Sequence, residues 1–162
     1  MPEHVTIIDA KTCHAGVIAA IYNQALGERL STFETEPRTA DDMAEWLSGE
    51  IAVKLAVIDG KVAGFAKVSN YRDRACYTGI REYSVYVDRA FQRRGIGRKL
   101  MQELISTCRQ AGLWKLLSRI FPENVGSIEL AKSVGFRVVG TYYNHGQLDG
   151  VWKDCVIVEL SL

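Results

Sequence analysis

The chain has 162 residues, of which 48% are hydrophobic and 24% are charged, and its formal net charge is +1 at pH 7. This length and apolar content are typical of a single globular domain over residues 1–162, and they exclude a disordered protein. Because positive and negative charges nearly cancel, we expect no nucleic-acid partner. The local basic run at residues 89–99 suits a small anionic ligand instead.

The cysteine spacing and the N-terminal sequence bear on metal binding and location. Four cysteines stand far apart, without a C-x-x-C pair: Cys13, Cys76, Cys108 and Cys155. This spacing indicates neither a zinc site nor a disulfide framework, so we expect no metal and free thiols in a reducing cytosol. No basic segment followed by an apolar one opens the chain, and no apolar run approaches the ~18 residues of a membrane span. We therefore expect a cytoplasmic protein with no membrane partner.

The first elements expected along the chain are a short strand and two helices. A β-like run covers residues 5–8, and apolar residues at helical spacing predict a helix over roughly 10–26, with Asp9 as its cap. The segment that follows is expected to be extended or a loop. A second helix is predicted to begin after Thr39, a capping residue, and to end at Gly49.

The middle of the chain is predicted to form three strands and a long helix. Asp59-Gly60 is a strong hairpin signal between the β-rich runs 52–58 and 62–68. A polar stretch separates this hairpin from a strand predicted at Ile80–Val87. The helix that follows is expected to end near Gly112.

The last part of the chain is predicted to contain three strands and one helix. Residues 114–120 are typical of a strand, and residues 124–134 of a helix that Gly135 ends. A closing pair of strands is expected at 136–143 and 152–160. The whole order, β-α-α-β-β-β-α-β-α-β-β, predicts a mixed α/β domain without repeats.

A strand feeds a turn rich in glycine and arginine, Gln92–Gly97, which opens an amphipathic helix. A helix start has unpaired N–H groups and partial positive charge, and glycine lets a phosphate approach the backbone. Neither the dinucleotide fingerprint nor the P-loop spacing is present. The turn taken alone is also compatible with an ordinary connection that carries a solvated basic face.

The hexapeptide Q-R-R-G-I-G and the order of elements resemble the GCN5-related N-acetyltransferase (GNAT) superfamily. Nearly the whole chain resembles its phosphinothricin and methionine sulfoximine acetyltransferase group, and it is most similar to the arsinothricin acetyltransferases of arsenic-resistance operons. Markers of the resemblance include Ser31-Thr-Phe-Glu34, Glu82–Val87, Ser118–Asn124 and Gly150–Asp154. It implies the GNAT fold, with a mixed central sheet of about seven strands and about four flanking helices.

The resemblance implies acetyl-CoA as co-substrate, with its phosphates on the glycine turn. Backbone N–H groups and arginine charges would bind the phosphates, Ile96 is expected to point into the core, and Asn124 would bind the pantetheine arm or cap its helix. The residues expected to bind the cofactor are Val85, Tyr86, Val87, Arg93, Arg94, Gly95, Ile96, Gly97, Arg98 and Asn124.

Glu82 and the strand that carries it are the expected catalytic elements. An α-amino group with a pKa of about 7.7–8.0 needs only a modest base to lose its proton. In the resembling enzymes a glutamate at the position of Glu82 is the general base; a buried structural glutamate is the alternative. Backbone N–H groups of Tyr86 and Val87, above all that of Val87, would stabilise the oxyanion.

Arg72 and Arg74 are expected to bind the anionic groups of the acceptor. Arginines at i and i+2 on an extended segment point the same way; a solvated charged loop is the alternative. The resemblance favours the binding role, with Phe33 and Glu34 assisting, and implies a small toxic amino-acid analogue as acceptor and a homodimer. A different amine or protein substrate, or a non-catalytic CoA-binding module, stays open.

Two positions depart from the superfamily pattern. Many members place a tyrosine in the helix after Asn124 to protonate the leaving thiolate, and the matching position here is Ala131. That proton donor is therefore unassigned. The lysine that often lies between two late glycines is also absent, since the run here is Gly146-Gln147-Leu148-Asp149-Gly150. His145 precedes this run, and it is either a catalytic or a surface residue.

Overall fold

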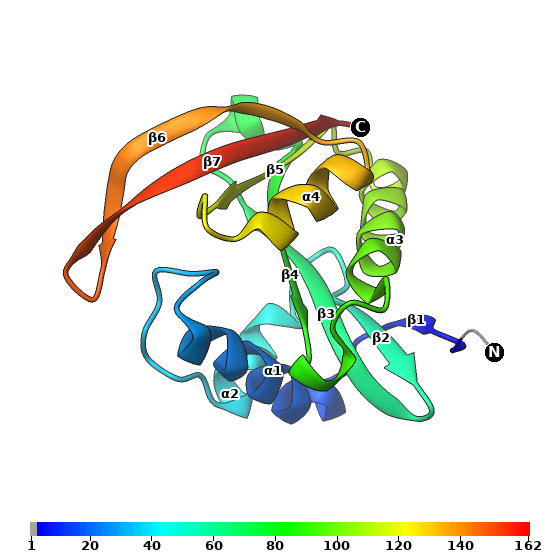
Figure 1. Cartoon of the computed structure of the whole chain (residues 1–162). Helices are drawn as coiled ribbons and strands as arrows, with labels where there is room; N and C mark the ends of the chain where they lie inside the picture. Colours follow the sequence, from blue (N-terminus) through cyan, green and yellow to red (C-terminus); the bar gives the residue numbers. More distant parts are fainter. Residues whose placement is uncertain (1–2) are drawn as a thin grey trace.

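The computed structural model describes residues 3–162 as a seven-stranded mixed sheet in the order β1-β2-β3-β4-β5-β7-β6 (Figure 1). All neighbouring strands are antiparallel except β4 and β5, which are parallel. The strands are β1 (Thr6–Asp9), β2 (Lys54–Ile58), β3 (Lys61–Asn70), β4 (Ile80–Val87), β5 (Lys115–Ile120), β6 (Arg137–Leu148) and β7 (Val151–Ser161).

Four α-helices lie on the two faces of this sheet. They are α1 (Ala15–Glu28), α2 (Ala40–Trp46), α3 (Ile96–Gln110) and α4 (Val125–Ser133). One buried cluster joins α1 and α2 to β2 and β3, and a second joins α3 and α4 to the other face. The predicted mixed α/β fold, with about seven strands and four helices in this order, is confirmed. None of the helices in residues 3–162 combines the length and apolar character needed to cross a membrane.

The start of α1 differs from the sequence prediction. The helix begins at Ala15, and its N-cap is His14, whose side chain makes no capping bond. Asp9 belongs to β1, where its carboxylate lies 2.6 Å from Nζ of Lys54 on the adjacent strand. The expected cap is therefore wrong, because the cross-strand lysine engages the carboxylate in the sheet.

The closing strands are longer than predicted and form a curved arm that extends beyond the rest of the sheet (Figure 1). They meet at Asp149-Gly150, where both residues have positive φ, 51° and 79°. An Asp-Gly pair with positive φ at both positions is a favoured two-residue hairpin turn. This signal places the turn directly between Leu148 and Val151, and the sequence prediction overlooked it.

Strands β4 and β5 separate along their length, and this gap positions the site. They pair only from Ile80 to Glu82 on β4, ending at the partner Leu117. Beyond this point β4 stays paired with β3 as far as Val87, while β5 stays paired with β7 as far as Ile120. The second half of β4 therefore has an edge that no strand within residues 3–162 covers.

Candidate active site

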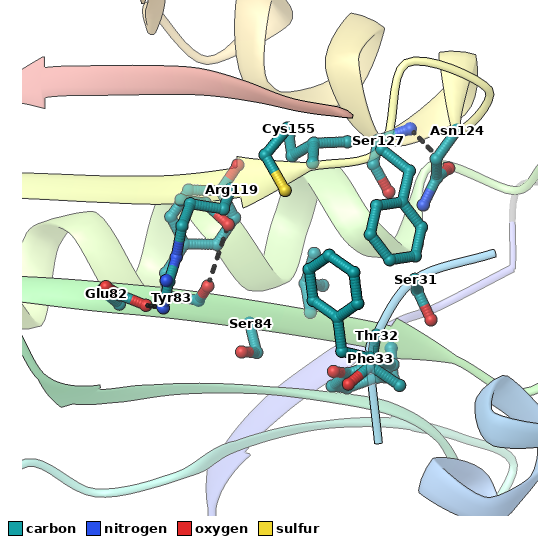
Figure 2. Close-up of a pocket in the computed structure, with 15 residues that line it drawn as sticks. Ser31, Thr32, Phe33, Glu82, Tyr83, Ser84, Arg119, Asn124, Ser127 and Cys155 are labelled. Atoms are coloured by element: carbon teal, nitrogen blue, oxygen red, sulfur yellow. Dashed lines mark hydrogen bonds and ion pairs between the residues drawn. The ribbon is translucent and has the colours of Figure 1, made fainter. Parts of the chain in front are cut away.

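Two adjoining cavities lie at the gap between β4 and β5. The larger, about 600 Å³, is lined by α1, the end of β4 and the first turns of α3 and α4. The smaller, about 220 Å³, lies between the loop after α1, β4 and β5 (Figure 2). The residues common to both are Ser31, Val85, Tyr86, Asn124 and Ser127. A ligand in one cavity therefore meets a ligand in the other beside these residues.

The glycine turn forms the floor of the larger cavity at the start of α3. Gly95 is the N-cap in the left-handed conformation, φ 74°, with open space where a Cβ would stand. The first intrahelical bond is from N–H of Lys99 to Gly95, so the N–H groups of residues 96–98 have no partner within the helix. This arrangement is suited to a phosphate.

The three arginines of this turn do not share one role. Arg93 and Arg98 line the larger cavity. Arg94 does not: its guanidinium lies 2.6 Å from the carboxylate of Glu3 and over the ring of Phe91. In this structure the Arg94 side chain therefore pairs with the N-terminal segment, and its predicted contact with phosphate stays a prediction.

Ile96 and Gly97 have packing roles at the same turn. Ile96 is 1% exposed and belongs to the core, as predicted. A Cβ on Gly97 would lie 3.0 Å from Cδ2 of Leu130 on α4. Close packing of α3 against α4 therefore accounts for glycine at position 97, whereas positive φ accounts for it at Gly95.

The register of β3 and β4 determines which amides face the gap. N–H of Asp88 donates to the carbonyl of Ala63 on the β3 side, 2.7 Å away. In an antiparallel pair these bonds recur at every second residue, so the amide of Tyr86 also faces β3. The amides of Val85 and Val87 face the gap. Of the two predicted donors, the amide of Val87 therefore faces the gap, whereas that of Tyr86 faces β3; Val85 is the second residue whose amide faces the gap.

An ion pair between Glu82 and Arg119 lies in the smaller cavity (Figure 2). Nη2 of Arg119 donates to Oε2 of Glu82 at 2.9 Å, and the side chains are 49% and 20% exposed, respectively. Within residues 3–162, Oε1 of Glu82 makes no hydrogen bond, so this oxygen is available to a ligand. The sequence prediction missed Arg119 as a site residue, because its contact with Glu82 depends on the parallel pairing of β4 and β5.

The loop after α1 covers the smaller cavity. The ring of Phe33 packs edge-to-face on Phe121, 4.8 Å between centroids, and a Cβ on Gly146 of β6 would lie 2.9 Å from it. Arg29, at the start of this loop, pairs with Asp149 at the tip of the arm. Phe33 therefore lies in the wall of the smaller cavity.

Glu34 clamps this loop and does not line either cavity. Its carboxylate accepts hydrogen bonds from the hydroxyl of Tyr22 and from two nitrogens of Arg38. Burial alone would raise the pKa of Glu34, but these bonds and the charge of Arg38 outweigh it and hold the pKa below its usual value. Both oxygens of Glu34 are therefore engaged by Tyr22 and Arg38.

Arg72 and Arg74 do not line either cavity. The segment is bent, since N–H of Arg74 donates to the carbonyl of Arg72. The two guanidinium groups lie over different rings, those of Tyr71 and Tyr77. The premise of an extended segment is therefore wrong, although the two rings contact each other edge-to-face, with 5.6 Å between their centroids. The exposed His145 stacks on a neighbouring tyrosine and also lies outside both cavities.

Asn124 caps α4 and faces both cavities. Its side-chain oxygen accepts from N–H of Ser127 at 3.3 Å (Figure 2), and its side chain lines both cavities. The capping alternative is therefore confirmed, and this placement leaves the amide nitrogen available to a ligand. Nearby, the buried Oγ of Ser31 has no hydrogen-bond partner among residues 3–162. Ala131 is fully buried and offers no proton donor.

A cysteine, Cys155, lines the smaller cavity but is only 1% exposed. Burial raises the pKa of its thiol, which disfavours the nucleophilic thiolate. Burial likewise raises the pKa of Cys108, in the core, to about 11. The exposed cysteines, Cys13 and Cys76, lie outside both cavities. The site therefore contains a carboxylate and polarised amides, without an activated thiol.

Comparison with known proteins gives the family that the sequence resembles. The model of the Acetyltransferase (GNAT) family matches residues 18–136. The chain is 29% identical to an L-methionine sulfoximine/L-methionine sulfone acetyltransferase of Pseudomonas aeruginosa, covering 97% of this chain and 94% of that one. It is 31% identical to the phosphinothricin N-acetyltransferase of Streptomyces coelicolor, covering 88% and 87% of the two chains.

A solved structure extends this similarity to the fold. The structure of yncA from Salmonella typhimurium with its cofactor acetyl-CoA superimposes with a TM-score of 0.94 at 29% identity. The superposition covers 98% of this chain and 94% of that one. The chain therefore belongs to the GNAT family of acetyltransferases and resembles its phosphinothricin and methionine sulfoximine acetyltransferase group at about 30% identity.

Proposed function

We propose that this acetyl-CoA-dependent N-acetyltransferase transfers the acetyl group to the α-amine of a small amino-acid analogue such as phosphinothricin, methionine sulfoximine or arsinothricin, giving resistance to it. The observation that carries the proposal is the pair of adjoining cavities, with Glu82 in the smaller one and the glycine turn in the larger. The first two acceptors are substrates named for relatives; arsinothricin is included because the sequence resembles those enzymes.

The larger cavity fits acetyl-CoA. Unpaired amides at the start of α3, together with Arg93 and Arg98, suit the pyrophosphate, and the amide nitrogen of Asn124 suits the pantetheine arm. The buried hydroxyl of Ser31 lacks a partner where the cavities meet. When bound, acetyl-CoA supplies an acetyl thioester, whose carbonyl would lie at the amides of Val85 and Val87.

Within a ternary complex, Glu82 is the general base. Its free Oε1 takes a proton from the α-ammonium, and the neutral nitrogen then forms a C–N bond with the thioester carbon. The amides of Val85 and Val87 stabilise the negative charge that develops on the carbonyl oxygen. When the C–S bond breaks, its electron pair leaves on sulfur, and solvent delivers the second amine proton there. Cys155 takes no part.

The volume of the smaller cavity limits the size of the acceptor. A volume of about 220 Å³, closed by Phe33 and Phe121, fits an amino acid better than a folded protein segment. Arg72 and Arg74 lie on the loop that follows β3, whose last residue pairs with Arg81 beside Glu82. We propose them as secondary contacts to an anionic acceptor side chain from the rim of the site.

A thiol-release assay tests this function. Acetyl-CoA is incubated with phosphinothricin, methionine sulfone, arsinothricin, or a peptide with a free N-terminus and an internal lysine. We expect thiol release with one or more amino-acid analogues and none with the peptide. Release with the peptide alone would establish the protein-substrate alternative, and binding of acetyl-CoA without release for any amine would establish a non-catalytic module.

We also propose that the chain forms a homodimer through the arm of β6 and β7. The arm carries six exposed apolar side chains: Val138, Val139, Tyr142, Tyr143, Val151 and Trp152. Exposed apolar side chains concentrated on one element suit an interaction surface, and a second copy is the partner that the resemblance implies. Sedimentation equilibrium is expected to give a dimer mass that Tyr143→Lys with Trp152→Lys reduces to a monomer; a wild-type monomer would contradict it.

A further inference from the structure

We propose that Arg119 binds the α-carboxylate of the acceptor, so that the pair Glu82–Arg119 recognises the ammonium and carboxylate groups on one Cα. This inference rests on the proposed function and makes its substrate class narrower. It assigns the enzyme to free α-amino acids, and it excludes their amides and peptide N-termini.

The charges of the smaller cavity match such an acceptor. Among the described residues that line it, Glu82 is the one carboxylate and Arg119 the one cation. Tyr86 lies four residues after Glu82 on the same side of β4, and it packs against α1. The side chain of Glu82, and that of Arg119 bonded to it, therefore lie on the face of the sheet that α1 and α2 cover. An α-amino acid carries the opposite charge at each point: its ammonium fits Glu82, and its carboxylate fits Arg119.

The existing ion pair can be exchanged for contacts with substrate. Arg119 is half exposed and donates only one hydrogen bond among residues 3–162, so most of its five donors remain available. An exposed pair contributes little to stability, so rearranging it costs little. A carboxylate accepts two parallel bonds from a guanidinium, which fixes its orientation as well as its position.

This contact also determines which nitrogen reacts. With the carboxylate on Arg119, the α-nitrogen lies beside Glu82 and faces the amides of Val85 and Val87 across the gap. A side-chain amine further from the carboxylate would miss Glu82. Glu82 and Arg119 therefore select the amine that lies at the right distance from the acceptor's own carboxylate, which is the α-amine. This selection needs no contact with the acceptor side chain.

The experiment compares a free amino acid with its α-carboxamide in the wild type and in Arg119→Met. Methionine sulfone is the preferred acceptor, because its side chain has no anionic group; phosphinothricin replaces it if only that compound is acetylated. Arg119→Met should raise KM for the free acid about 10- to 100-fold, because one charge-assisted contact is lost. The same substitution should leave KM for the carboxamide within about twofold. Comparing the variant with the wild type cancels the different amine pKa values of the two acceptors.

Two further variants make the result decisive. Arg119→Lys keeps a charge and should recover part of the discrimination, while Arg109→Met, an exposed arginine at the end of α3, should change neither KM. Equal increases in KM for acid and carboxamide, or no increase for either, would overturn the role of Arg119. If the wild type acetylates neither acceptor nor any other amino acid, the proposed function fails instead.

Discussion

Glu82→Gln is the substitution that bears most directly on the chemistry. The amide keeps the size of the side chain but cannot take a proton, so kcat should fall about 10²- to 10⁴-fold, the usual contribution of a general base. Because Glu82 does not line the larger cavity, affinity for acetyl-CoA should stay within about twofold. The lost ion pair with Arg119 is partly exposed, so the free energy of unfolding should fall by no more than about 1 kcal/mol.

These three quantities separate a base from a structural glutamate. Steady-state thiol release gives kcat, calorimetric titration gives acetyl-CoA affinity, and thermal unfolding gives stability, with Glu103→Gln on the exposed face of α3 as the matched control. A buried structural glutamate would instead lower stability with little specific effect on turnover. Unchanged kcat for Glu82→Gln from about pH 6 to about pH 9 would refute the assignment.

The remaining predictions concern a hydroxyl, the thiols and the loop clamp. Ser31→Ala removes a buried hydroxyl without a partner, so stability should be unchanged or rise by up to about 1 kcal/mol while KM for one of the substrates rises; a lower Tm with unchanged kinetics would contradict a ligand contact. In the native protein a thiol reagent should modify the two exposed cysteines quickly, and it should modify Cys108 and Cys155 only after unfolding. Cys155→Ala should keep most of kcat. An acetylated Cys155 would argue for a covalent route. Because the pKa of Glu34 is lowered by folding, its contribution to stability is present at neutral pH and lost as pH falls below the ordinary value of 4.5. Glu34→Gln should therefore lower Tm at pH 7, and on acidification its Tm should fall by less than that of the wild type. Parallel curves of Tm against pH for the two proteins would refute the stabilising role of the Glu34 carboxylate.

The elements that the sequence predicted well are those with strong local signals. Strand β4 has the bounds predicted, Ile80–Val87, and Asp59-Gly60 forms the expected hairpin turn with positive φ at both residues. The start of α3 follows directly from the glycine turn. Local backbone preferences and apolar periodicity determine these features, so they do not depend on distant partners.

The features of the site that the sequence did not reveal depend on contacts between distant segments. Arg94 is held by Glu3, 91 residues away in the chain, and Arg119 meets Glu82 only because β4 and β5 are parallel neighbours. The amide that faces the gap is determined by the register of β3 and β4, which distinguishes Val85 from Tyr86. Strand register and long-range ion pairs are tertiary properties, and a motif on one segment does not determine them.

The most direct test of the central claim is mass spectrometry of the products formed from isotope-labelled acetyl-CoA and one amino-acid acceptor. The proposed mechanism predicts one labelled acetyl group on the α-nitrogen of the acceptor for each thiol released, with the protein itself unlabelled. Label on Cys155, label on a side-chain nitrogen of the acceptor, or thiol release without acetylated product would contradict direct transfer to the α-amine.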